Sequence, residues 1–477
     1  MRYFVYILCM MGVYNAYAQE CSIFATNPTY AGKHIEISTL DNFISNEKII
    51  LYKGEVNKLG TINITIPNIS TPKLAYLDAG QYRILFYLEA NVTLNFTLPN
   101  YKERTPEQLK NPFFRADEIW AQLALPKKSL TDFVMKTDIR YSTVMNAYFG
   151  TLRYRYSDSL ITLANDIIAD SDDDKTKFRS DYLQYRKHML EYSLRPHKWL
   201  NIIHKYLNKE LLLNNSSFTS LFDEVFRNHV DVDISKDRKF IAIINRADHK
   251  SIVPYIKNKY QISDNTAYLI AIKSIYNGYY LNYFGRQKCI DACKYLSTKT
   301  MNDSLKKIAT EVYKKVYHLS VNSPAPHIAL SNINGGNISL DSFDKNKMLL
   351  IHFSDIDLYT AKQEISYLNT MTVGMDDFIE VMYLFKTGNS PDSIANFVKQ
   401  YDIKGQFAIC NTSLPDEYRV VSWPTTYLLD ESNKLLESPA QNPMSGLDRT
   451  LKNLIRQKQA APKRQENKVS EDNSFNF

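Results

Sequence analysis

The spacing of hydrophobic residues changes twice along the 477-residue chain. From residue 22 to about residue 100, apolar and polar residues alternate, as in Thr61-Ile-Asn-Ile-Thr-Ile66, which is the period of strands with one buried face. From Asn111 to about residue 320 the period becomes helical, and it is clearest in a stripe formed by Leu305, Ile308, Val312, Val316 and Leu319. After residue 321 short strand-like and helix-like runs follow each other.

A chain of this length exceeds what a single hydrophobic core usually holds, so several domains are expected. The pattern predicts a multidomain α+β protein. We expect an N-terminal antiparallel β-sandwich over residues 19–100, a central α-helical domain over residues 101–320 and a C-terminal α/β domain over residues 321–456.

The first 18 residues have the features of a secretory signal peptide. Arg2 gives a basic start, an apolar stretch follows, and Ala16-Tyr-Ala18 precedes a predicted cleavage before Gln19. Such a segment predicts a periplasmic or secreted protein, and no comparable apolar run follows it, so we expect no transmembrane segment after cleavage. Cys21 lies close to the predicted cut, but Tyr17-Ala-Gln-Glu-Cys21 lacks the small residues of a lipoprotein signal.

The end of the chain, residues 457–477, is polar and contains Pro462, which predicts a disordered tail. The net charge of +7 is spread along the chain, where basic and acidic residues alternate. Such a distribution indicates solvated helix faces rather than a nucleic-acid surface, so we expect no nucleic-acid partner.

The C-terminal region contains a distinctive order of segments. Met348-Leu-Leu-Ile-His-Phe353 is long enough for one buried strand, and Thr360–Leu368 can follow as a helix. About sixty residues later, Trp423-Pro424 precedes the run Thr425-Thr-Tyr-Leu-Leu429. A proline at this place belongs at the start of a strand and not inside an ordinary central one.

These segments resemble the thioredoxin-like family of secreted bacterial disulfide reductases and peroxiredoxins, the TlpA/peroxiredoxin-like proteins of the Bacteroidetes. The resemblance covers roughly residues 321–455. It implies a C-terminal thioredoxin-like fold, a cis peptide bond between Trp423 and Pro424, and an active-site helix that begins near residue 358. The N-terminal β-domain likewise resembles one that precedes thioredoxin-like domains in such proteins.

The family carries a Cys-x-x-Cys motif where this chain has Leu358-Tyr359-Thr360-Ala361. Disulfide exchange requires a thiolate that attacks sulfur and forms a mixed disulfide, and neither leucine nor alanine can do this. We therefore expect no redox reactivity at residues 358 and 361.

Three other cysteines leave an alternative open. Cys289 and Cys293 lie four residues apart in a helical pattern, where they share one face. They can be buried packing residues or a surface dithiol, although a bridge within one helical turn departs from disulfide geometry. Cys410 ends the strand-like run Phe407-Ala-Ile-Cys410, where a cysteine is usually a small buried hydrophobic residue.

His352, Asp355 and Asp357 lie at the strand-to-helix junction where the family keeps its active site. Imidazole and carboxylate groups can bind a metal or transfer a proton, but a histidine in a core strand is more often structural. We find no zinc, phosphate or serine-nucleophile motif in the sequence, and we predict no cofactor and no metal.

The resemblance implies a groove lined by Leu358, Tyr359, Thr360, Ala361, Trp423, Pro424 and Thr425. In the family, the backbone before the proline pairs with an extended segment by strand addition. Trp423 can be an aromatic anchor for a bound peptide or glycan, or it can pack against residues 354–361 and fill the groove. The hypothesis is a non-catalytic binding or assembly protein whose partner is an envelope protein or an extended peptide. The alternative is a thiol-disulfide oxidoreductase that uses the other cysteines.

Overall fold

The computed structural model describes residues 19–111, 113–126, 128–154, 157–169, 176–299 and 302–460. The predicted signal peptide, residues 1–18, and residues 461–477 of the predicted tail lie outside this range. The chain is a mixed α/β protein with several sheets and many helices, and it divides into two compact units, residues 1–316 and 317–477. The segment predicted as β-sandwich lies in the first unit, and so does the segment predicted as helical domain up to residue 316, whereas residues 317–320 belong to the second unit.

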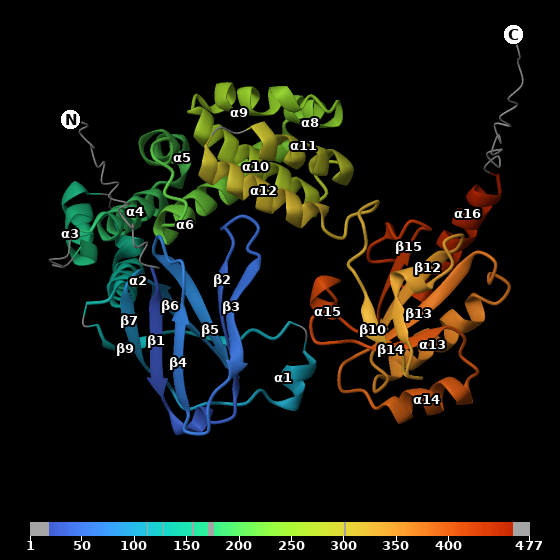
Figure 1. Cartoon of the computed structure of the whole chain (residues 1–477). Helices are drawn as coiled ribbons and strands as arrows, with labels where there is room; N and C mark the ends of the chain where they lie inside the picture. The colour runs from blue at the N-terminus through green and yellow to red at the C-terminus, as the bar shows by residue number, and fades with distance from the viewer. Residues whose placement is uncertain are drawn as a thin grey trace, which may run out of the picture. The chain divides into compact units, whose positions relative to one another are not determined.

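Two facing sheets form the β-structure of the first unit (Figure 1). One sheet has the order β4-β1-β7-β9 and the other β3-β2-β5-β6-β8. The alternation seen in the sequence is realised in β4, where Ile62, Ile64 and Ile66 are buried and the residues between them face outward. Isoleucine, leucine and phenylalanine side chains of both sheets fill the space between them and form one core. The strands are β1 (Cys21–Thr26), β2 (His34–Leu40), β3 (Lys48–Glu55), β4 (Thr61–Ile66), β5 (Lys73–Ala79), β6 (Tyr82–Leu88), β7 (Val92–Thr97), β8 (Asp117–Trp120) and β9 (Gln122–Leu125).

The sandwich differs from the prediction in two respects. Its pairing is mixed and not wholly antiparallel, because β1 runs parallel to β7 and β6 runs parallel to β8. It also extends past residue 100, since β8 joins one sheet, β9 joins the other, and Ala121 is the residue between them. Strands of four residues are too short to show a clear period, which explains why the sequence pattern placed this segment with the helices.

Helices make up the rest of the first unit, and most of their buried residues belong to one large core. The predicted stripe of α12 is confirmed for Leu305, Ile308, Val312 and Val316, which are all buried there. Leu319 lies beyond the end of that helix, with a φ of 58°, so this part of the stripe prediction is wrong. The helices are α1 (Pro106–Lys110), α2 (Leu130–Tyr154), α3 (Asp158–Ala169), α4 (Lys177–Leu194), α5 (Trp199–Ile202), α6 (Ser216–Val225), α7 (Asp231–Lys236), α8 (Arg238–Asn245), α9 (Ile252–Tyr260), α10 (Asp264–Tyr280), α11 (Arg286–Lys299) and α12 (Asp303–Tyr317).

Tyr87 of β6 joins the sandwich to the helices. It is 1% exposed, and its ring stacks on Trp120 at 6.4 Å and meets the edge of Phe178 at 5.8 Å. Its backbone N–H donates to the Thr131 hydroxyl, and its own hydroxyl lies 2.7 Å from that of Ser216. The sandwich and the helical segment therefore share packing and hydrogen bonds at this residue.

The second unit is built on one sheet with the order β14-β13-β12-β15-β16 (Figure 1). β12, β13 and β14 are parallel, whereas β15 and β16 are antiparallel to their neighbours. β10 and β11 form an antiparallel hairpin outside this sheet, and Gly335 and Gly336 lie in the turn between them. The elements are β10 (Ala329–Ser331), β11 (Asn337–Ser339), β12 (Met348–Ser354), α13 (Tyr359–Met371), β13 (Ile379–Phe385), α14 (Pro391–Gln400), β14 (Gln406–Ile409), α15 (Leu414–Glu417), β15 (Thr425–Leu429), β16 (Leu435–Glu437) and α16 (Leu447–Ala460).

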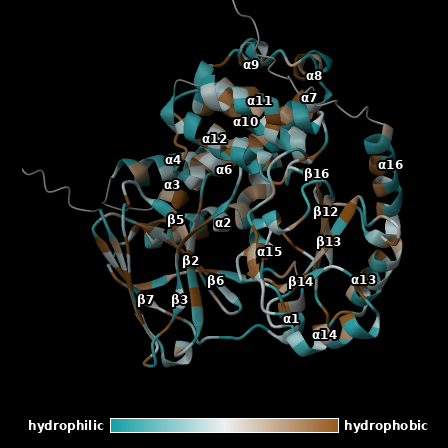
Figure 2. Cartoon of the chain, turned by 45° about the vertical axis from the view of Figure 1, so that its right-hand side comes forward, coloured by the Kyte–Doolittle hydropathy of each residue, from teal (hydrophilic) through white to brown (hydrophobic). Residues whose placement is uncertain are grey.

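Both faces of this sheet are covered. Helices α13, α14 and α16 pack on one face, and the β10–β11 hairpin and α15 pack on the other. As a result every residue of β12 is buried, and hydrophobic residues predominate in it, with His352 and Ser354 as the polar exceptions. Figure 2 shows the strand within the second unit. Figure 2 also shows hydrophobic and hydrophilic residues alternating along α16, which extends to Ala460. Residues 457–460, which were predicted as the start of a disordered tail, are thus the end of a helix.

Among the residues that the structure describes, no helix combines the length and the apolar character needed to cross a membrane.

Replacement of Tyr87 tests the junction between sandwich and helices. We expect Tyr87→Ala to lower the free energy of unfolding by about 3–5 kcal/mol, because a large buried ring is lost. Tyr87→Phe keeps the ring and removes only the contact with Ser216, so its cost should be about 1 kcal/mol. Urea denaturation followed by circular dichroism measures both values, and equal effects of the two variants would contradict the packing role.

Candidate functional site

The pairing of β12 with β15 brings two distant segments to the same end of the sheet. The register runs from Leu349 opposite Leu429 to Phe353 opposite Thr425. The chain therefore leaves β12 for residues 355–358 at the place where residues 421–424 enter β15. The structure thus brings the two halves of the predicted groove to one end of the sheet.

The peptide bond between Trp423 and Pro424 is cis, as the resemblance implied. The Trp423 side chain is half-buried, and its ring meets the edge of Phe353 at 6.1 Å. Phe353 belongs to the core on the sheet face opposite α13. Trp423 therefore packs on the end of that core, and the aromatic contact that the structure gives it is with β12 and not with residues 354–361.

A small polar network fixes the loop after β12. The Asn389 side-chain amide donates to Asp355 at 3.0 Å and to Asp357 at 3.2 Å, and its oxygen accepts the backbone N–H of Ile356 at 3.2 Å. Lys386 forms an ion pair with Asp355 at 3.2 Å. One buried asparagine thus satisfies three groups of the loop and holds it in a single conformation.

Asp355 remains charged in this network. Burial by itself would raise the pKa of its carboxyl, but hydrogen bonds from Asn389, from the Asp357 N–H and from Lys386 outweigh this and lower the pKa below its usual value. A carboxylate that is stabilised in the folded state favours folding at pH values above its unfolded pKa.

His352 is separate from this network, so the predicted grouping of His352, Asp355 and Asp357 holds only for the two carboxylates. Its Nδ1 lies 2.9 Å from the Thr426 hydroxyl, and its ring meets that of Tyr383 at 5.9 Å. The side chain is fully buried, and this desolvation lowers the pKa of the imidazole to about 4. A neutral, enclosed imidazole is a structural residue and has no direct access to a ligand.

Residues 358–361 form the start of α13. Leu358 is the N-cap residue, half-buried and without a side-chain capping bond, and Tyr359 is 74% exposed. Thr360 is also exposed. Ala361 is completely buried because it lies on the same helix face as Ile365 and Leu368. Ala361 therefore cannot line an open groove, and this part of the predicted site is corrected.

The cysteines that the structure describes are all free and buried, namely Cys21, Cys289, Cys293 and Cys410. Burial raises the pKa of the Cys289 and Cys410 thiols to about 12 and raises that of Cys293 as well. Cys289 and Cys293 belong to the large helical core. Cys410 belongs to the core on the sheet face opposite α13. None of these thiols has the exposure or the lowered pKa of a reactive cysteine.

Within the described ranges, no group of three or more histidine, cysteine, aspartate or glutamate side chains is arranged to hold a metal ion.

Asn389 and Lys386 were not singled out from the sequence. They follow β13 and reach back to the loop after β12, because adjacent parallel strands end at the same edge of the sheet. The sequence signal that could have identified Lys386 and Asn389 is the strand-like run Ile379–Phe385 directly before them. A parallel pairing of this run with β12 brings the residues after both strands together. Thr426, the partner of His352, was covered only as a neighbour of the predicted Thr425.

No protein-family model matches the chain, and no curated protein matches it. Solved structures resemble about 28–29% of it. The thioredoxin domain of a thiol-disulfide oxidoreductase from Bacteroides vulgatus is 17% identical, with 28% of this chain and 98% of that chain covered and a TM-score of 0.25. A thiol:disulfide interchange protein from a Bacteroides species is 17% identical, with 29% of this chain and 92% of that chain covered and a TM-score of 0.27. A thioredoxin family protein from Chlorobium tepidum is 16% identical, with 28% of this chain and 97% of that chain covered and a TM-score of 0.24.

The polar network predicts a specific dependence of stability on pH. Because the pKa of Asp355 is lowered in the folded state, its contribution is complete above the unfolded pKa of about 3.9 and is lost as the pH falls through the folded value. Asp355→Asn should therefore make the unfolding free energy lower at pH 7 and less dependent on pH in the acid range.

Urea denaturation at pH 7 and pH 3 measures this difference. Asp376→Asn, at an exposed aspartate of the same unit, is the matched control and should leave the acid-range dependence nearly unchanged. Parallel pH profiles for unmodified protein and Asp355→Asn would show that the network does not hold a charged Asp355.

Proposed function

We propose that this protein is a non-catalytic binding or assembly protein of the periplasm or the secreted fraction, in which the C-terminal unit docks a partner without electron exchange. The observation that carries the proposal is the start of α13, where Leu358 and Ala361 occupy the places of the family's two cysteines. Secretion rests on the predicted signal peptide alone.

The chemistry of the described cysteines supports this proposal over the oxidoreductase alternative. A thiol must be partly ionised and reachable to attack a disulfide. Cys289 and Cys293 are 0% and 2% exposed, and Cys410 is 3% exposed, with raised pKa values in each case. A substrate disulfide would have to enter a packed core to meet any of them.

The exposed surface beside α13 supports a docking role. Tyr359 is 74% exposed and Val421 is 58% exposed, on the two segments that meet at the end of β12 and β15. Within the part of the chain that the structure describes, no backbone carbonyl accepts a hydrogen bond from the N–H groups of Val421, Ser422 and Trp423. An extended peptide could pair with these groups as an added strand while its side chains contact Tyr359 and Val421.

The two edges of the five-stranded sheet are less suitable for strand addition. On the β16 side, the Leu435 N–H donates to the Ser323 carbonyl at 3.0 Å. On the β14 side, the Ile333 N–H donates to the Phe407 carbonyl at 3.0 Å. Because other segments of the same unit already use both edges, residues 421–423 are the backbone that we assign to a partner.

A rigid loop also favours binding, because less entropy is lost when the partner docks. Asn389 holds the backbone of Ile356 and both neighbouring carboxylates, so the approach to Leu358 and Tyr359 is fixed before binding. Lys386 offsets the charge of Asp355 on the same loop.

Introducing two cysteines tests whether only sulfur is missing. We expect the unmodified chain to leave the rate of insulin reduction by dithiothreitol unchanged. The double variant Leu358→Cys/Ala361→Cys should accelerate it, because a thiol at a helix N-terminus has a lowered pKa. The single variant Leu358→Cys is the control, and it should react with a thiol reagent but not sustain turnover.

Catalysis by the unmodified chain that is lost in Cys289→Ser or Cys410→Ser would contradict the proposed function and favour the alternative.

Docking at the surface formed by Tyr359 and Val421 can be tested separately with peptides. Extended peptides selected on the purified chain from a random library should lose at least tenfold in affinity on Tyr359→Ala or Val421→Asp, because such contacts dominate binding. Tyr401→Ala, at a tyrosine that is 50% exposed after α14, is the matched control and should bind as the unmodified chain does. Peptides that are insensitive to both loop variants would place the docking surface elsewhere.

A further inference from the structure

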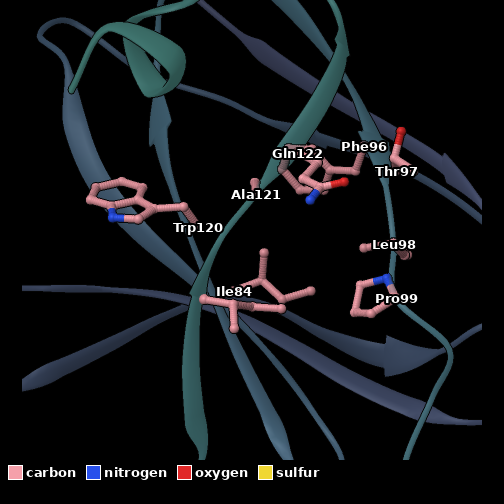
Figure 3. A pocket seen from close by; sticks show the side chains of 9 residues that line it. Ile84, Phe96, Thr97, Leu98, Pro99, Trp120, Ala121 and Gln122 are labelled. Carbon is pink, nitrogen blue, oxygen red and sulfur yellow. The ribbon is translucent and has the colours of Figure 1, made fainter. Parts of the chain in front are cut away.

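A cavity of about 250 Å³ lies in the sandwich of the first unit, where the chain passes from one sheet to the other. β8 pairs with β6, β9 pairs with β7, and Ala121 connects them. Figure 3 shows Ile84 and Leu98 projecting into the space from different sides, with Ala121 and Gln122 along the crossing segment. The lining residues are Ile84, Phe96, Thr97, Leu98, Pro99, Ile119, Trp120, Ala121 and Gln122.

The cavity persists because its walls cannot close over it. Ala121, at the crossing, is 2% exposed and has only a methyl side chain. The register of β7 against β9 shifts between Asn95 and Phe96, and β7 ends at Thr97. The regular pairing of the two strands is therefore interrupted next to the cavity. Leu98 and Pro99 then leave the sheet and form the opposite wall.

The lining determines what the cavity can hold. No charged side chain is among the lining residues, and Thr97 and Gln122, both exposed, are the hydroxyl and amide side chains at its border. The remainder is aliphatic or aromatic apart from the indole N–H of Trp120. Water in such a space finds few hydrogen-bond partners, whereas an apolar group that displaces it gains the free energy of burial.

The volume sets the size of the occupant. An apolar cavity of about 150 Å³ holds a benzene molecule. By the same ratio of volume to carbon atoms, a cavity of about 250 Å³ accommodates about ten carbon atoms. This is more than a single leucine or phenylalanine side chain needs.

We propose that this cavity is a binding site for the aliphatic chain of a small, uncharged amphiphile. The aliphatic chain of the ligand enters between residues 97–99 and 119–122 and contacts Ile84, Phe96 and Leu98. The polar end of the ligand remains at Thr97 and Gln122. This site is in the first unit and does not depend on the function proposed for the second unit.

Isothermal titration of the purified full chain with straight-chain alcohols from hexanol to dodecanol tests the proposal. Binding should saturate at one site, and the affinity should rise about fourfold with each added methylene, as burial of one CH₂ predicts. The increase should stop at about ten carbon atoms, when the cavity is full. A negative heat-capacity change on binding should accompany the burial of apolar surface.

Leu98→Phe fills the cavity and should weaken decanol binding at least tenfold. Leu123→Phe makes the same exchange at a partly buried residue of β9 that does not line the cavity, and it should bind decanol as the unmodified chain does. Circular dichroism confirms that each variant is folded, and Ala121→Leu is a second filling variant if Leu98→Phe is not. The absence of saturable binding up to the solubility limit would overturn the proposal, as would equal binding by the filled and control variants.

Discussion

The antiparallel pairing of β12 with β15 is the constraint on which the candidate site depends. It places the loop after β12 and the segment before β15 at one end of a sheet that is covered on both faces. A shift of this register by one residue would turn Phe353 away from its core and His352 toward it. The surface that includes Tyr359 and Val421 thus results from strand register and does not require a catalytic group.

Much of the architecture could be predicted from the sequence, because it rests on periodicity. The isoleucines of Thr61–Ile66 and the stripe from Leu305 to Val316 both repeat long enough to show their period. The short strands at Asp117–Leu125 do not, and they were assigned to the helical region. The parallel pairing of β1 with β7 joins segments about 70 residues apart in the chain, and local pattern carries no information about such contacts.

The candidate site was only partly predictable for the same reason. The resemblance located residues 358–361 and 423–425, but it could not show that Ala361 is buried or that Trp423 packs on Phe353. Asn389 lies more than 30 residues from Asp355 and Asp357, and only the adjacent ends of two parallel strands bring them together. The framework of strands and hydrogen bonds around the start of α13 is complete although Leu358 and Ala361 carry no thiol, which agrees with the binding role proposed above.

Mass spectrometry after incubation with oxidised glutathione measures whether any of the four cysteines that the structure describes is available for exchange in the folded protein. Because all four thiols are buried, we expect no glutathione adduct at Cys21, Cys289, Cys293 or Cys410 in the native protein and adducts at all four after unfolding in urea. An adduct that forms rapidly at Cys289, Cys293 or Cys410 of the folded protein would instead show that a thiol is available for disulfide exchange.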